Sequence, residues 1–212
     1  MRSSIRPAFV GIDFDNTIVR YDRLFHQACV DKRLIPATVP ANKSDVRDHL
    51  RRNGQEDLWT EMQGEVYGSR MAEADAFPGV LDFFRACTRL GVRLAIVSHK
   101  TRYPYVGPRY DIHAAAYGWL EMQGLFDEAD IGLRRDAVFF ELSKGEKLAR
   151  IGSIGCDTFI DDLPEILSDA SFPAGVDPIL FDPADAAPPD LPYRRITSWP
   201  QLTEQFFGRP DA

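Results

Sequence analysis

Two acidic residues stand one residue apart where a short apolar segment ends. Asp13 and Asp15 belong to the stretch AFVGIDFDNTIV, residues 8–19, in which Asn16 and Thr17 lead back to apolar residues. Acids are common in turns that end strands, but an acid-x-acid-x-Thr pattern arises rarely by chance at ordinary residue usage. We therefore interpret Asp13 and Asp15 as candidates for chemistry.

Further polar residues follow later apolar segments. Ser98 comes after VRLAIV, and Asp161 and Asp162 come after TFI. In an open parallel sheet, ligands bind outside the carboxyl ends of the strands, where the loops meet. Two alternatives stay open: Ser98 could be a turn hydroxyl, and Asp162 could cap a helix that has Pro164 near its first position.

A lysine stands at a predicted helix start. The stretch SKGE, Ser143–Glu146, has the pattern of a capping box with Ser143 as the cap. Lys144 then falls in the first turn, where the positive end of the helix dipole disfavours a cation. An anion nearby would explain the lysine, so Lys144 is the favoured candidate. Lys147, one turn further along, is the alternative.

These residue types together suit one kind of chemistry. Carboxylates from two strand ends can hold a hard cation such as Mg²⁺, which also takes water and substrate phosphate as ligands. A lysine and a serine hydroxyl can satisfy phosphate oxygens. One carboxylate can attack phosphorus while another exchanges protons with the leaving group and water. The set therefore predicts phosphoryl transfer through an aspartyl phosphate with Mg²⁺ as cofactor.

Alternating strands and helices must position this set. Apolar runs rich in β-branched residues predict buried strands, and apolar faces that end at glycine predict helices. We expect strands at Val10–Ile12, Val92–Val97, Thr158–Ile160 and Pro178–Phe181, and helices from Pro78 to Leu90 and from Asp111 to Gln123. This alternation predicts an α/β fold with a doubly wound parallel sheet.

Residues 21–77 show helix patterns but no convincing strand. Ser44 is the expected cap of one helix, and Leu58, Met62 and Val66 recur at four-residue intervals in another. We therefore expect a small helical insertion at residues 21–77 in an α/β core made of residues 1–20 and 78–212. The Pro- and Asp-rich stretch at residues 182–192 is expected to be a surface loop.

The four segments DFDNT, VSHK, SKGE and FIDD, in this order, resemble the four motifs of the haloacid dehalogenase (HAD) superfamily. The resemblance spans about Phe9 to Asp162, and the first and last motifs are the specific ones. It implies a HAD-like hydrolase of the phosphatase branch, in which the insertion after the first motif is a helical cap. Asp15 favours phosphate chemistry, because the dehalogenases of the superfamily lack the second acid of the first motif.

The resemblance also implies a role for each residue. Asp13 would be the nucleophile and a metal ligand, and Asp15 the general acid-base, with its backbone carbonyl also binding the metal. Thr17 would orient Asp15, and Ser98 would hydrogen-bond the phosphoryl group. Lys144 would neutralise charge, while Asp161 and Asp162 would complete the metal site.

A polar loop follows Ser98. His99, Arg102 and Arg109 stand there among three tyrosines. Guanidinium groups bind carboxylate and phosphate well, and tyrosines stack and hydrogen-bond, so these residues are candidates for substrate binding. The alternative is an ordinary solvated loop.

Composition limits the classes of partner and location. The formal charge of -7 argues against a general nucleic-acid binder, and no segment approaches the apolar length of a membrane span. The three cysteines form no C-x-x-C pair and are expected to be buried thiols. We expect a cytoplasmic Mg²⁺-dependent phosphatase acting on a small phosphorylated metabolite. A phosphotransferase, a phosphomutase or a non-catalytic regulatory protein is the alternative, and the oligomeric state is open.

Overall fold

The chain folds into two compact units in a computed structural model that describes residues 6–208. The core unit consists of residues 6–18, Ala76–His99 and residues 124–208. The helical unit consists of Val19–Asp75 and Lys100–Gln123. Residues 100–123 were expected in the core, whereas they cluster with the helical unit in the structure.

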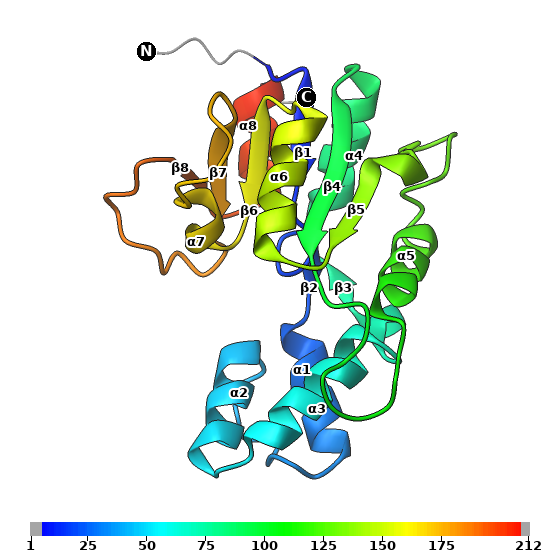
Figure 1. Ribbon diagram of the computed structural model, residues 1–212, viewed down its shortest axis with the longest axis vertical. Coiled ribbons are helices and arrows are strands. Elements are labelled where there is room, and N and C mark those ends of the chain that lie inside the picture. The colour runs from blue at the N-terminus through cyan, green and yellow to red at the C-terminus, as the bar shows by residue number, and fades with distance from the viewer. Residues whose placement is uncertain (1–5, 209–212) are drawn as a thin grey trace. The chain divides into compact units, whose positions relative to one another are not determined.

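The core unit is built on six parallel strands in the order β5-β4-β1-β6-β7-β8 (Figure 1). The strands are β1 (Phe9–Ile12), β4 (Arg93–His99), β5 (Val138–Glu141), β6 (Thr158–Asp161), β7 (Asp177–Phe181) and β8 (Arg194–Ile196). The chain passes from β1 outward to β4 and β5, and then returns to β6 on the other side of β1. This reversal makes the carboxyl ends of β1 and β6 the switch point where ligands of doubly wound sheets bind.

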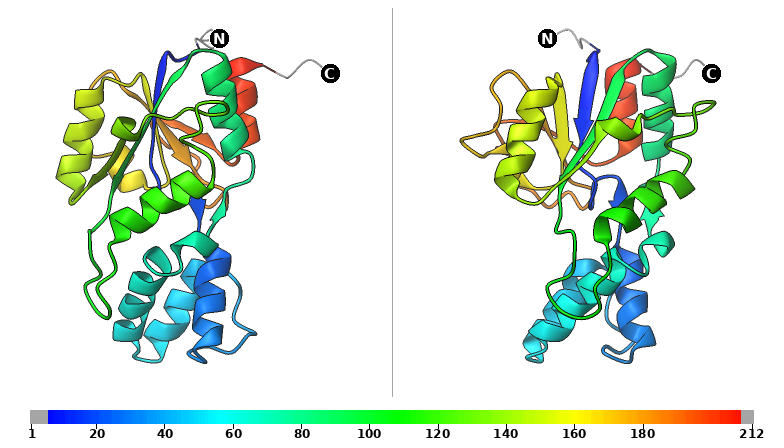
Figure 2. Two further views of the ribbon diagram at one scale, coloured as in Figure 1. Left: turned by 90° about the vertical axis from the view of Figure 1, so that its right-hand side faces the viewer. Right: turned by 45° about the vertical axis from the view of Figure 1, so that its right-hand side comes forward.

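Helices cover both faces of this sheet. They are α4 (Val80–Arg89), α6 (Lys144–Ile154), α7 (Pro164–Leu167) and α8 (Trp199–Phe207), with a short 3-10 turn η2 (Arg135–Ala137). Helix α6 lies on one face, and α4 and α8 lie side by side on the other (Figure 2). The predicted doubly wound α/β fold is therefore confirmed. Residues 182–192 contain no helix or strand, as expected.

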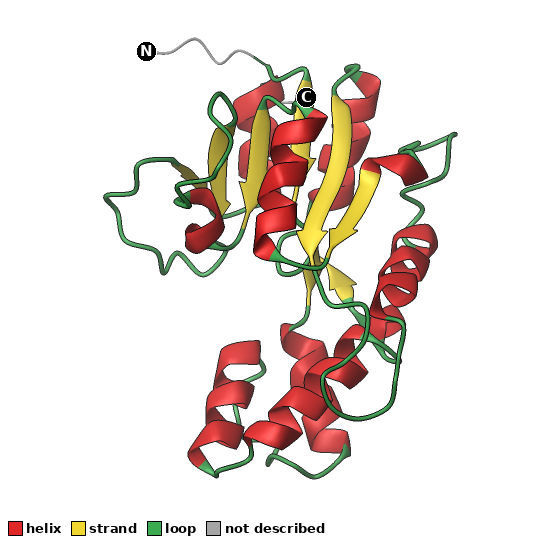
Figure 3. Cartoon of the chain, in the orientation of Figure 1, coloured by secondary structure: helices red, strands yellow, loops and turns green. Residues whose placement is uncertain are grey.

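The helical unit contains α1 (Asp22–Asp31), α2 (Lys43–Arg52), α3 (Glu56–Tyr67), α5 (Ile112–Met122) and the 3-10 turn η1 (Met71–Glu73) (Figure 3). A short pair of strands, β2 (Val19–Arg20) and β3 (Asp75–Ala76), stands at its ends and was not predicted. Aromatic side chains fill its interior: the Phe25 ring lies 4.8 Å from Trp59 and 5.6 Å from Tyr67, centroid to centroid. Burial of these rings holds the helices together.

The cap of α2 differs from the expectation. The side chain of Asn42, whose backbone is extended, accepts a hydrogen bond of 2.8 Å from the Asp45 amide. Ser44 lies inside the first helical turn, so its prediction as the cap is wrong. Two residues with capping side chains stand close together here, and the helix begins after the first of them.

Residues 100–123 join the helical unit through close contacts. The Trp119 indole donates a hydrogen bond of 2.9 Å to the Ala74 carbonyl. Pro104 lies against Gly64, and Tyr110 lies against Gly68, where a Cβ atom would come within 2.7 and 2.5 Å of these side chains. The glycines thus let the loop approach α3 closely, which no local sequence pattern reveals.

The three cysteines are free thiols, and all three are buried as predicted. Within residues 6–208, none of the helices is long and apolar enough to cross a membrane.

Candidate active site

The first motif forms a tight turn after β1. The Asp13 amide donates a hydrogen bond of 2.8 Å to the Ile160 carbonyl of β6, which continues the pairing of the two strands. The Ile18 amide then closes the turn on the Phe14 carbonyl at 3.0 Å. Asn16 has a φ of 58°, in the left-handed region that asparagine tolerates better than most residues. The turn directs the Asp13 carboxylate to the switch point.

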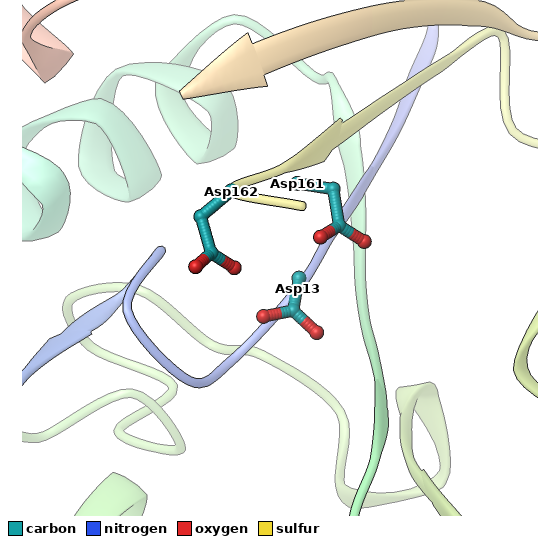
Figure 4. Close-up of side chains that lie close together, drawn as sticks. All are labelled: Asp13, Asp161 and Asp162. Carbon is teal, nitrogen blue, oxygen red and sulfur yellow. The ribbon is translucent and has the colours of Figure 1, made fainter. Parts of the chain in front are cut away.

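Three carboxylates converge there. Asp13, Asp161 and Asp162 each offer an oxygen atom, and these atoms lie within 4.8 Å of one another (Figure 4). The Asp161 carboxylate also accepts a hydrogen bond of 3.0 Å from the Leu163 amide. The alternative role of Asp162 as a helix cap is not observed, because the residue that precedes α7 is Leu163.

Lys147 lies between two of these carboxylates. Its Nζ atom is 2.6 Å from Asp13 Oδ1 and 2.6 Å from Asp161 Oδ2, and the lysine side chain is fully buried. Lys144 points elsewhere: its Nζ lies 2.7 Å from the Glu165 carbonyl and 2.6 Å from Asp169 Oδ2. The prediction that Lys144 is the lysine beside Asp13 is therefore wrong, and Lys147, the alternative, occupies that place.

Helix geometry explains this correction. Ser143 does cap α6, since its side chain accepts from the Glu146 amide, so the predicted helix start is confirmed. Side chains on a helix point back toward its N-terminus, however, and cover the turn before their own Cα atom. A residue one turn inside the helix therefore reaches the strand ends. Lys147 also stands beside the buried Leu148 and Ile151, a signal in the sequence that marks it as core-facing.

Burial and charge act on the ionisable groups of this cluster. Burial raises the pKa of Asp161, and the neighbouring Asp13 carboxylate adds to this effect. Burial also disfavours the charged form of Lys147, but Asp13 and Asp161 outweigh it and hold its pKa above the ordinary value. The pKa of His99 is lowered by burial and by the Lys147 ammonium. The lysine thus remains a cation between acids.

The carboxylate group fits Mg²⁺ in its chemistry. All of its donors are oxygen atoms, which hard divalent cations prefer. Asp161 Oδ2 is paired with Lys147 Nζ at 2.6 Å, and Asp161 Oδ1 accepts from the Leu163 amide.

The remaining residues of the first motif stay close to the cluster. The Thr17 hydroxyl lies 3.4 Å from both Asp13 Oδ2 and Asp162 Oδ1. Asp15 is half-buried in the same turn. Its role as acid-base and the metal contact of its backbone carbonyl stay predictions.

Strand β4 carries two further predicted residues. Ile96 of β4 pairs with Ile12 of β1, so Ser98 and Asp13 both follow this pair at the same edge of the sheet. Ser98 is buried, and His99, the last residue of β4, is half-buried. Their predicted contacts with substrate stay predictions.

The two predicted arginines belong to the helical unit. Arg102 pairs with Asp111 at 3.1 Å, and the Arg109 guanidinium lies 4.0 Å from the centre of the Tyr103 ring. Both arginines thus have local structural roles, and substrate binding by them stays a prediction.

No protein-family model matches the sequence, and no curated protein matches it significantly. Solved structures do match the fold. A putative HAD-hydrolase of Bacillus subtilis, solved bound to magnesium, is 15% identical, with a TM-score of 0.55 over 95% of this chain and 99% of that one. A HAD family hydrolase of Deinococcus radiodurans, solved with bound phosphate and sodium, is 18% identical, with a TM-score of 0.55 over 93% of each chain.

Other enzymes share this architecture. Protein tyrosine kinase A of Mycobacterium tuberculosis is 17% identical, with a TM-score of 0.63 over 95% of this chain and 99% of that one. A dehalogenase shares it too. At identities this low, the similarity establishes a shared fold but does not identify the reaction. The chain has the Rossmann-like α/β fold of the HAD-superfamily hydrolases, with an acidic cluster at the switch point of its sheet.

Proposed function

We propose that the protein is a Mg²⁺-dependent phosphatase that hydrolyses a small phosphorylated metabolite through an aspartyl phosphate. The observation that carries this proposal is the buried Lys147 between Asp13 and Asp161, 2.6 Å from each carboxylate. Burying three charged groups costs several kcal/mol unless they satisfy one another. Binding and reaction of a charged substrate would explain why these three charged groups are retained in the interior.

Asp13 is the nucleophile in this proposal. One of its carboxylate oxygens forms a bond to phosphorus, the ester P–O bond breaks, and Asp15 donates a proton to the leaving oxygen. Asp15 then takes a proton from water as that water attacks phosphorus. The bond between phosphorus and Asp13 breaks, which releases phosphate and restores the Asp13 carboxylate and the protonated Asp15.

The other residues of the site position and neutralise the charges of the Asp13 carboxylate and the substrate phosphate. Lys147 fixes the Asp13 carboxylate and offsets its charge as the phosphate dianion approaches, and the Ser98 hydroxyl donates to a phosphoryl oxygen. Asp13, Asp161 and Asp162 would hold Mg²⁺, which, when bound, screens the charges of the carboxylates and the phosphate. The magnesium and phosphate found in the two hydrolases that share the fold support this choice of ion and substrate.

The helical unit is proposed to act as the cap that selects the substrate, with His99, Arg102 and Arg109 as candidate substrate contacts. A cytoplasmic location also stays part of the proposal.

A phosphate-release screen tests the activity. The purified full chain is incubated with sugar phosphates, nucleotides and phosphorylated acids, with Mg²⁺ or with EDTA, and with no acceptor other than water. We expect phosphate release that needs Mg²⁺. No release from any ester would overturn the proposal.

Two further assays distinguish the phosphatase from other reaction classes. Transfer of phosphate only when an alcohol or peptide acceptor is added would identify a phosphotransferase, a reaction class that the tyrosine kinase with this fold makes worth testing. Halide release from 2-haloacids would identify a dehalogenase, which the presence of Asp15 argues against.

A further inference from the structure

The C-terminal helix reaches the first motif through one tryptophan. Trp199, the first residue of α8, is fully buried, and its Nε1–H donates a hydrogen bond of 3.1 Å to the Thr17 carbonyl. The two residues are 182 positions apart in the chain. This bond ties the turn that carries the nucleophile to a helix that supplies no other residue of the proposed site.

Thr17 is the residue of the turn that touches the carboxylates. Its hydroxyl lies 3.4 Å from Asp13 Oδ2 and from Asp162 Oδ1. Its side chain is fully buried, and a buried carbonyl of this kind needs a hydrogen-bond donor. Trp199 supplies that donor. A shift of the Thr17 backbone would therefore move the hydroxyl relative to both acids.

The indole has little freedom to move. Its ring lies 5.0 Å from Phe83 of α4 and 5.5 Å from Phe181 of β7, centroid to centroid. The next residue, Pro200, packs on Gly79, where a Cβ atom would come within 2.8 Å of the proline ring. The donor is thus held in one orientation by the core, as a positioning group must be.

We propose that Trp199 is a positioning residue, which fixes the nucleophile turn through the Thr17 carbonyl. The inference rests on the proposed function for its effect on turnover, but its effect on the turn can be measured without activity. A tryptophan that merely fills the core would satisfy its N–H somewhere in the interior, and would affect stability alone.

The decisive variant replaces Trp199 with benzothienylalanine, which keeps the bicyclic shape and lacks the N–H group. Trp199→Phe is the simpler second variant. Trp119 gives a matched control: it is equally buried, and its indole donates to the Ala74 carbonyl at 2.9 Å in the helical unit. The same two replacements at Trp119 remove the same kind of bond away from the motif turn.

Hydrogen exchange of the Ile18 amide reports on the turn, because this amide donates to the Phe14 carbonyl. We expect exchange to accelerate by about 10-fold in the Trp199 variants, as loss of about one hydrogen bond implies, and not in the Trp119 variants. Unchanged exchange at Ile18 would overturn the inference, whether or not the protein proves to be a phosphatase.

Steady-state kinetics test the consequence. In the Trp199 variants kcat should fall by about 5- to 10-fold with KM unchanged, and the Mg²⁺ concentration for half-maximal rate should rise. The Trp119 variants should keep the wild-type kcat. Equal losses of kcat at both positions, or none at Trp199, would show a structural role only. A wild-type protein without turnover would instead refute the proposed function, and the exchange result would still decide the role of Trp199.

Discussion

The core unit contains a buried cluster of charged side chains in addition to surface ion pairs such as that of Lys144 with Asp169. In the core unit, Asp13, Asp161 and Lys147 are all almost fully buried and interact with one another. In the helical unit, by contrast, the half-buried Arg70 pairs with two exposed acids, Asp31 at 2.9 Å and Glu73 at 2.7 Å.

Buried charged groups lower the stability of the fold unless they satisfy one another, whereas exposed ion pairs have little effect on it. A buried cluster loses the hydration of each ion, and it is often no more stable than apolar residues of similar size. A surface pair gives up little hydration and contributes little. We infer that selection for chemistry maintains the buried cluster, because its stability alone gives no reason to keep it. Four substitutions test this contrast.

Asp13→Asn should have the largest effect on activity. Removing the proposed nucleophile should lower turnover by more than about 10⁴-fold, while Lys147 keeps its partner Asp161 and the fold persists. Phosphate release and thermal unfolding measure the two effects. Turnover within tenfold of wild type would remove Asp13 from the mechanism and leave the buried cluster without a functional reason.

Lys147→Ala should have the largest effect on stability. It leaves Asp13 and Asp161 buried without a cation, which we expect to cost about 3–5 kcal/mol and to abolish turnover. Lys144→Ala is the matched control on the same helix: its partly exposed pair with Asp169 should be worth about 1 kcal/mol or less. Urea unfolding measures both. Equal effects at the two lysines would contradict the contrast between buried and surface charge.

Asn42→Ala tests the helical unit, where we expect a helix-capping hydrogen bond to contribute more to stability than a surface ion pair. Loss of the cap of α2 should cost about 1 kcal/mol without changing kcat. Ser44→Ala, one position inside the helix, is the control and should have a smaller effect. A larger loss for Ser44→Ala would restore Ser44 as the cap.

Glu73→Gln should have the smallest effect. The hydrogen bond from Arg70 lowers the pKa of Glu73 below its ordinary value of 4.5, so this pair stabilises the fold above that pH, and the contribution is lost as pH falls through the lowered pKa. The variant should lose about 1 kcal/mol or less at pH 7, and nothing relative to wild type in acid. Unfolding at several pH values gives the comparison, and a difference that grows in acid would have the wrong sign.

The strands that could be predicted from the sequence are those formed by continuous apolar runs. Strands β1, β4, β6 and β7 are buried runs of this kind, whereas β5 and β8 lie at the sheet edges, and Arg194 and Arg195 make β8 unlike a buried strand. The prediction that Asp13, Asp161 and Asp162 lie close together at the strand ends is confirmed.

What could not be predicted depends on direction and on distant contacts. A capping pattern locates a helix start but does not say which lysine of the first turns reaches the strand ends, so Lys144 was preferred to Lys147. The place of residues 100–123 depends on the fit of Pro104 to Gly64, and the hydrogen bond from Trp199 to Thr17 joins segments with no shared motif.

These long separations have a consequence for how the protein folds. Asp13 meets Lys147 across 134 positions and Thr17 meets Trp199 across 182, so the acidic turn is synthesised long before the groups that neutralise and hold it. Contacts between distant segments slow folding, because long loops must close before the contacts form. We therefore expect the proposed active site to be among the last regions to become native. Recovery of activity after dilution from denaturant should accordingly follow the slowest folding phase.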